Sequence, residues 1–217
     1  MDYDLYRSKR KTIAVTIERD GNVVVRAPLT MPQYQIDRFI QSKYAWIEDN
    51  VKRAKERASK YSFAGLEEGC KLLYFGQIVD VKLTEGNTKL RDGILYVPNK
   101  PNRRDHVIRM MKRDLKKFLL NNIPVYETAL HVKAASVKVG SAKTRWGSCS
   151  STNNLNFSYR LAMCPPVVIN YVIVHELSHI RHHDHSARFW STVETVCPNW
   201  RIYKKWLDDN SYLMEIL

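Results

Sequence analysis

The sequence of 217 residues contains no apolar run near the ~18 residues that a membrane-spanning helix needs. Its first eleven residues lack the apolar centre of a secretory signal peptide. The four cysteines, Cys70, Cys149, Cys164 and Cys197, form no C-x-x-C pair. There is no internal repeat and no low-complexity run. These absences argue against a membrane protein, a disulfide framework and a repeat architecture. We expect a cytoplasmic protein with reduced thiols.

Hydrophobic residues make up 44% of the chain and charged residues 26%, so the chain can bury a folded core. The net charge is +13, from 35 Lys and Arg against 22 Asp and Glu. From Pro165 onward the chain is close to neutral, so the excess lies in residues 1–164. The segment Lys100–Lys117 alone holds eight basic and two acidic residues. This charge makes a nucleic acid or a nucleotide a candidate partner.

The chain reads as β-rich, then mixed, then helical, with no regular alternation of strand and helix, so we expect an α+β fold. Asp20-Gly21 predicts a hairpin between strands at 12–18 and 22–26. Apolar spacing predicts helices over 33–59, 103–122 and 167–182, with further helices from Ser186 and from Trp200. Short strands are expected at 72–75, 78–83, 93–97, 136–140, 144–150 and 155–158. We treat residues 1–217 as a single domain, with a β-rich lobe over 1–100 and a zincin-like catalytic lobe over 101–217.

Five of the seven histidines lie within eleven residues, and the first of them opens the motif His175-Glu176-Leu177-Ser178-His179. Residues four apart on a helix project from one face, so His175 and His179 can reach one Zn²⁺ ion. Glu176 lies beside the first ligand, where a carboxylate can act as a general base. A strongly apolar run from Val167 to Val174 precedes the motif and would bury the helix. The pattern therefore predicts a catalytic zinc site rather than a buried histidine pair.

A catalytic zinc site needs a third protein ligand. His185 is the favoured candidate, because it follows the expected helix end and can approach the metal from another direction. Glu194 is the alternative, as a ligand on a later helix. His182 and His183 are expected to be solvated or to lie around the site, where His183 could help to bind an oxyanion.

Several residues before the metal helix are candidates for substrate binding. Lys143 and Arg145 could bring positive charge to the cleft, unless their segment is only a tight turn with a packed Trp146. The strand Leu155–Ser158 could be the edge strand that pairs with an extended peptide. Tyr159 and Arg160 could stabilise an oxyanion, or they could be a buried phenol and a salt-bridged arginine. Cys149 and Cys164 read as small buried residues.

The segment from Gly140 to Trp190 contains R-W-G-S-C at 145–149, L-N-F at 155–157, Y-R-L at 159–161, C-P-P at 164–166 and H-E-L-S-H at 175–179, and ends with His185 and an aromatic pair at 189–190. Together these motifs resemble the YgjP-like metallopeptidases, a family of zinc hydrolases with a compact zincin-like core. The resemblance implies His175, His179 and His185 as metal ligands and Glu176 as the catalytic residue. The metal helix alone is more distantly similar to the SprT-like and WLM metalloproteases.

The sequence thus predicts a zinc-dependent hydrolase, foremost a metallopeptidase acting on a peptide or protein. Two alternatives remain open at this point. The same site could hydrolyse a nucleotide phosphoanhydride, in the manner of a pyrophosphatase, with Lys143, Arg145 and Arg160 holding the phosphates. Alternatively, the chain could be a nucleic-acid-binding protein whose zinc is structural, which would require a closed site with four protein ligands.

Overall fold

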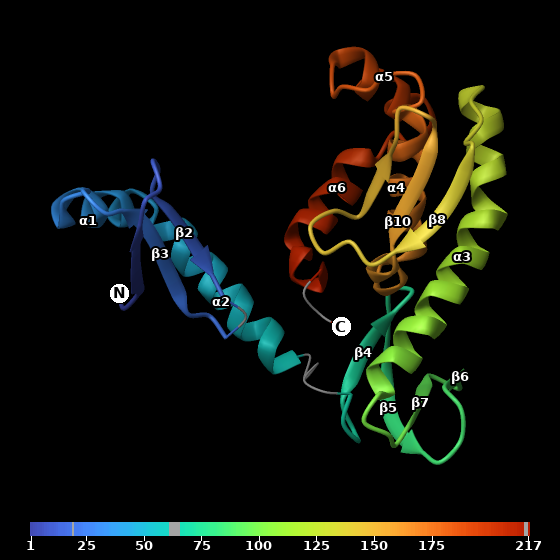
Figure 1. Cartoon of the computed structure of the whole chain (residues 1–217), viewed down its shortest axis with the longest axis horizontal. Helices are drawn as coiled ribbons and strands as arrows, with labels where there is room; N and C mark the ends of the chain where they lie inside the picture. The colour runs from blue at the N-terminus through green and yellow to red at the C-terminus, as the bar shows by residue number, and fades with distance from the viewer. Residues whose placement is uncertain (19, 61–65, 215–216) are drawn as a thin grey trace. The chain divides into compact units, whose positions relative to one another are not determined.

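The computed structural model describes residues 1–18, 20–60, 66–214 and 217 of the chain. They form two compact units, Met1–Ser62 and Phe63–Leu217 (Figure 1). The sequence predicts a boundary between its two lobes near residue 100, whereas the structure groups the strands between residues 71 and 98 with the second unit. The expectation of a single domain over the whole chain stays a prediction. Among the described residues, no helix has both the length and the apolar character to span a membrane.

The N-terminal unit contains β1 (Asp4–Ser8), β2 (Ala14–Ile17) and β3 (Val23–Pro28), in the order β1-β3-β2. The expected hairpin is confirmed, because β2 and β3 pair antiparallel from Ala14–Arg26 to Ile17–Val23. Gly21 adopts a φ of +89° in the turn, a conformation that glycine reaches without steric cost. The first strand was not predicted; it pairs parallel with β3.

The single helix expected over 33–59 is wrong, because the structure has two helices, α1 (Gln33–Ser42) and α2 (Tyr44–Lys60). Lys43 leaves the helical conformation between them, at a point that no glycine or proline marks. Ile36 and Ile40 of α1 and Ile47 of α2 still share one core with Val23 and Val25 of β3. The apolar spacing therefore predicts the buried face correctly but not the break.

The second unit begins with a sheet of β4 (Lys71–Tyr74), β5 (Gln77–Thr84), β6 (Lys89–Arg91) and β7 (Ile94–Pro98), in the order β4-β5-β7-β6. The turn between β4 and β5 lies against the segment that precedes the helix of the H-E-x-x-H motif. Phe75 N–H donates to the Ala162 carbonyl at 2.7 Å. A Cβ on Gly76 would lie 2.8 Å from Cα of Pro165, so this close approach requires glycine.

The long helix α3 (Arg103–Leu130) links this sheet to a second one. Figure 1 shows the first sheet near the early turns of α3 and the second sheet along its later turns. The helix runs through Pro124 and ends at Leu130, eight residues beyond the expected end at residue 122. The second sheet contains β8 (Ser136–Gly140), β9 (Gly147–Cys149) and β10 (Asn154–Ser158), in the order β8-β10-β9.

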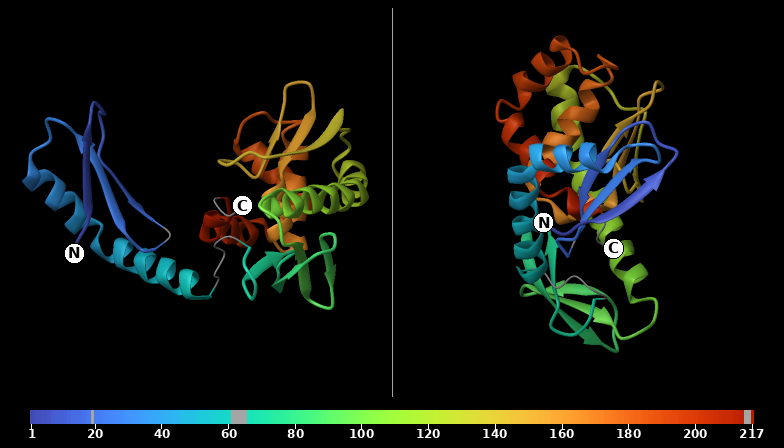
Figure 2. Two further views of the ribbon diagram at one scale, coloured as in Figure 1. Left: turned by 60° about the horizontal axis from the view of Figure 1, so that its bottom comes forward. Right: turned by 90° about the vertical axis from the view of Figure 1, so that its left-hand side faces the viewer.

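After a short 3-10 helix, η1 (Tyr159–Met163), the chain forms α4 (Pro166–Ser178), α5 (Ala187–Val196), α6 (Trp200–Asp209) and η2 (Ser211–Met214). Helix α4 packs against α3, α5, α6 and β9, and Figure 2 shows the helices on one side of the β8-β10-β9 sheet. Ile169, Ile173 and Leu177 of α4 are fully buried. The expected α+β class is confirmed.

Candidate metal centre

Helix α4 is the buried element that carries the H-E-x-x-H motif. Pro166 occupies its first turn, where the missing N–H costs nothing. Nine of its thirteen residues are buried, so the helix is apolar nearly all round. It ends at Ser178, earlier than the sequence analysis expected, and His179 is its C-cap. The polar run that follows, 181–185, would be costly to bury in a continuing helix.

The structure brings His175, His179 and His185 together, with one ligand atom of each lying within 4.8 Å of the others. The Nε2 atoms of His175 and His185 are 3.2 Å apart. Two nitrogen ligands at ~2.0–2.1 Å from a tetrahedral zinc ion lie about 3.3 Å from each other. The spacing of these two imidazoles therefore fits a shared metal ion. His179 and His185 lie with their ring centroids 4.8 Å apart.

The environment keeps two of these imidazoles neutral. Burial lowers the pKa of His175 to about 3, with the neighbouring His179 and His185 adding to the effect. Burial also lowers the pKa of His179. Neutral imidazole is the form that binds a metal. The Nδ1 of His179 lies 3.0 Å from the His182 carbonyl, and this contact leaves Nε2 free as a ligand atom. The Nδ1 of His175 is buried without a hydrogen-bond partner.

Glu176 is 5% exposed, and its side chain lies where α4 packs against the strand β9. A Cβ added to Gly147 would lie 2.6 Å from Oε1 of Glu176, so the carboxylate rests directly against the glycine backbone. Burial raises the pKa of Glu176 to about 8, and the positive charge of Arg145 opposes the rise. A carboxyl group with a pKa close to neutrality is suited to accept and return a proton.

Two other predicted site residues lie near the cluster. Arg145 is exposed and acts electrostatically on Glu176. His183 is exposed and its charge acts on His179. Cys149, expected to be a buried apolar residue, is only half-buried and lies near Glu176. Burial raises the pKa of its thiol, and the charge of Glu176 adds to the rise.

Tyr159 and Arg160 are buried, and their polar groups bond elsewhere. The Tyr159 hydroxyl and the Arg160 guanidinium both donate to the main-chain oxygen of Leu217. Arg160 also donates to the Ala142 carbonyl at 3.3 Å, and its guanidinium lies 4.5 Å from the Tyr159 ring centre. Tyr159 is therefore the buried phenol of the alternative reading, whereas the Arg160 guanidinium bonds to main-chain oxygens instead of the expected salt bridge.

Glu194, the alternative third ligand, is ion-paired with Arg201 at 2.6 Å. Among the described residues, the group of potential metal ligands consists of His175, His179 and His185, without Glu194. His182 contributes its carbonyl to His179.

The strand Leu155–Ser158 is not an edge strand. It belongs to β10, which pairs with β8 on one side and with β9 on the other. The edge strand that contacts Glu176 is β9, whose segment the sequence predicts either in the cleft or as a tight turn. A glycine inside a short strand, where another group approaches closely, is the sequence signal that could have identified it.

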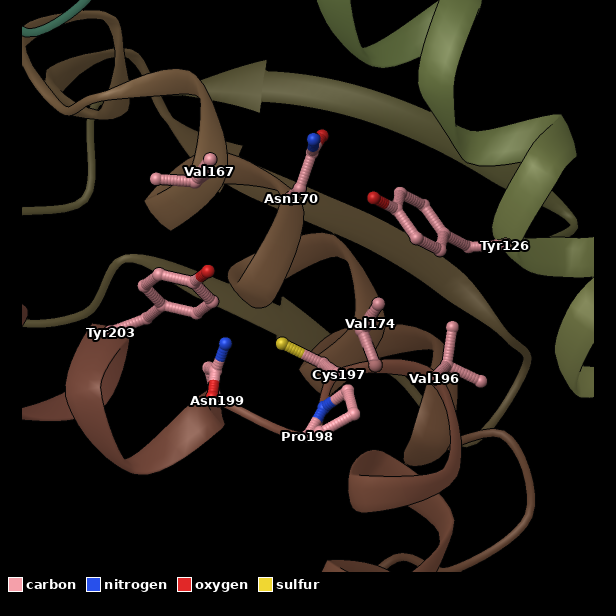
Figure 3. A pocket seen from close by; sticks show the side chains of 9 residues that line it. All are labelled: Tyr126, Val167, Asn170, Val174, Val196, Cys197, Pro198, Asn199 and Tyr203. Atoms are coloured by element: carbon pink, nitrogen blue, oxygen red, sulfur yellow. The ribbon is translucent and has the colours of Figure 1, made fainter.

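A pocket of about 170 Å³ lies on another side of α4 (Figure 3). Val167, Asn170 and Val174 line it from α4, and Figure 3 shows Tyr126 and Tyr203 facing it from α3 and α6. His175, His179 and His185 are not among the residues that line it. The Asn170 Oδ1 is buried there without a hydrogen-bond partner.

Comparison with known proteins confirms the resemblance drawn from the motifs. A family model described as "YgjP-like, metallopeptidase domain" matches residues 11–210. A crystal structure of the metallopeptidase zymogen of Pyrococcus abyssi abylysin is similar at 21% identity and a TM-score of 0.38, covering 42% of this chain and 89% of that chain. A search of curated proteins gave no match.

Proposed function

Because the chain belongs to the YgjP-like family of metallopeptidase domains, we propose that it is a zinc-dependent peptidase with His175, His179 and His185 as ligands. The observation that carries the proposal is the convergence of these three imidazoles beside a buried glutamate. Three protein ligands leave a position open for water or substrate, as in catalytic zinc sites.

The bound zinc ion would supply a Lewis acid that polarises the scissile carbonyl and lowers the pKa of water. Glu176 takes the proton of the attacking water at its carboxylate and passes it to the leaving amine. Its buried place against Gly147 supports this role, because the carboxylate is held in one position and shielded from bulk water. His183 and Arg145 are exposed near this carboxylate and the histidines, where either can donate to a developing oxyanion.

We assign substrate alignment to β9. It is an edge strand of its sheet, and Gly147 touches the catalytic carboxylate. An extended peptide can add to such an edge through main-chain hydrogen bonds, and this would bring its carbonyl groups toward Glu176.

The two alternative functions draw less support. Hydrolysis of a phosphoanhydride requires cations for the phosphates, but the Arg160 guanidinium is buried and bonded to main-chain oxygens. A structural zinc site requires four protein ligands, whereas the candidate group in the described part of the chain has three.

The test is an activity profile of the zinc-loaded protein against a peptide library and a panel of nucleoside triphosphates, with chelator-treated protein as the blank. We expect peptide cleavage that requires the metal. Turnover of nucleotides alone would overturn the peptidase assignment in favour of the phosphoanhydride hydrolase.

A further inference from the structure

His185 differs from the other two histidines of the cluster in what holds it. His175 and His179 belong to α4 and its cap, whereas His185 lies on the turn between α4 and α5 and is exposed. Asp184 shapes this turn, because its Oδ1 accepts from the Ser186 N–H at 3.1 Å. That bond orders the backbone but leaves the imidazole free to rotate. A separate contact is needed to fix the ring.

A column of stacked rings supplies that contact. The His185 ring stacks on Trp190, with centroids 5.7 Å apart and planes 29° apart. Trp190 stacks in turn on Trp200, with centroids 4.1 Å apart and planes 16° apart. Trp190 comes from α5 and Trp200 from the start of α6, so the column joins the turn to two helices.

The outer end of the column is closed by a cation. The Arg201 guanidinium lies 4.4 Å from the Trp200 ring centre, and Arg201 pairs with Glu194 at 2.6 Å. Trp200 is 8% exposed, so it forms a nearly buried backing for Trp190. Stacked and edge-on aromatic pairs stabilise a structure beyond the effect of the area that they bury.

We propose that Trp190, backed by Trp200, is a positioning residue that holds the His185 imidazole ready to bind the metal. An exposed side chain on a turn loses rotational freedom when it binds, and a prior stack removes that cost. Phe189 also contacts the cluster, with its ring 4.9 Å from His185, but it is fully buried and contacts all three histidines. Trp190 lies 5.7 Å from the His175 ring as well, but it is tilted by 58° to that ring and stacks only on His185. Trp190 is half-buried, so its replacement can be tested without emptying the core.

The inference rests on the proposed metal site, and metal binding tests it without reference to activity. The variants are Trp190→Leu, which keeps apolar volume without a flat ring, and Trp190→Phe, which restores one. Trp206→Leu is the matched control, because Trp206 is a half-buried indole on α6 with no ring contact to the histidines among the described residues. Zn²⁺ affinity is measured by competition with a chromophoric chelator, and the visible spectrum of the Co²⁺-loaded protein reports ligation.

We expect Trp190→Leu to weaken zinc binding ~10–100-fold, as the replacement of residues that orient metal ligands commonly does. The cobalt spectrum should change with it, and Trp190→Phe should recover most of the affinity. In the metal-free protein the His185 ring protons, assigned with His185→Ala, should lose their ring-current shift in Trp190→Leu. If Trp190→Leu matched Trp206→Leu in affinity and spectrum, the positioning role would be wrong. If the wild-type protein bound no zinc, the proposed function itself would fail.

Discussion

At the scale of single residues, Gly147 is the position that most closely limits the Glu176 carboxylate, the proposed general base. A methyl group there would lie 2.6–2.9 Å from three atoms of Glu176. Because Glu176 is buried, its side chain cannot swing into solvent to make room. We expect Gly147→Ala to lower kcat on the order of a hundredfold, as a shift of about 1 Å in a catalytic group can do. Zinc content should be unchanged.

Gly86→Ala is the matched control for this change. A Cβ on Gly86 would meet its nearest neighbour at 3.6 Å, an ordinary contact. Steady-state kinetics of the two variants, with thermal melts to confirm folding, check the prediction. Full activity in Gly147→Ala would show that the carboxylate is not held by this contact.

His183 and His185 provide a second comparison at this scale, since both are exposed histidines on one turn. Of these two, only His185 lies close enough to His175 and His179 to share a metal ion with them. Replacing a residue that supports a metal ligand lowers metal affinity ~10–100-fold, so His185→Ala, which removes a ligand, should weaken zinc binding by at least that much. His183→Ala should leave zinc binding nearly unchanged. Elemental analysis after dialysis measures the retained zinc. Equal loss from both variants would sink the assignment of His185.

At the scale of elements, α4 combines the function with the core. Ile173 is fully buried on the helix that presents His175. We expect Ile173→Ala to lower the free energy of unfolding by ~2–5 kcal/mol, through lost burial and the cavity left behind. Ile202→Ala on α6 removes the same atoms from a side chain that is 65% exposed, and should cost less than ~0.5 kcal/mol. Urea denaturation of both proteins measures the difference, and similar losses would contradict the burial of α4.

The sequence predicts best those elements that a short stretch of residues specifies by itself. The hairpin around Gly21 and the apolar helix carrying His175 follow from turn chemistry and from a run of apolar residues. The break at Lys43 carries no glycine or proline, and the central place of β10 depends on pairing with two distant segments. Such long-range pairings are decided by tertiary packing, which periodicity along one chain does not reveal.

In the candidate site, too, the sequence predicts some residues and misses contacts between distant segments. Spacing along one helix places His175 and His179 on one face, and a ligand beyond a turn points to His185. The contact between Gly147 and Glu176 joins residues from two elements, and no local pattern encodes it. Tyr159 and Arg160 looked available because the sequence does not reveal that both bond to Leu217.

At the scale of the whole molecule, the net charge of +13 is unevenly distributed along the chain. Arg109 and Lys117 are exposed on α3, and we propose that they contribute to an electrostatic surface for a nucleic acid. The affinity for duplex DNA should fall as salt rises, because binding releases counterions. Replacing both residues with glutamine should reduce the slope of log K against log salt by about 2. Fluorescence anisotropy measures this, and DNA binding that is absent or insensitive to salt would contradict the proposal.

The central claim is that Glu176 performs the proton transfer at a site that three histidines build. Glu176→Gln keeps the shape that rests on Gly147 and removes the carboxylate. The direct measurement is kcat for peptide cleavage by this variant, together with its bound zinc. We predict an unchanged zinc content and a kcat reduced by ~10²–10⁴-fold, the usual contribution of general acid–base catalysis. Full activity with zinc retained would contradict the account.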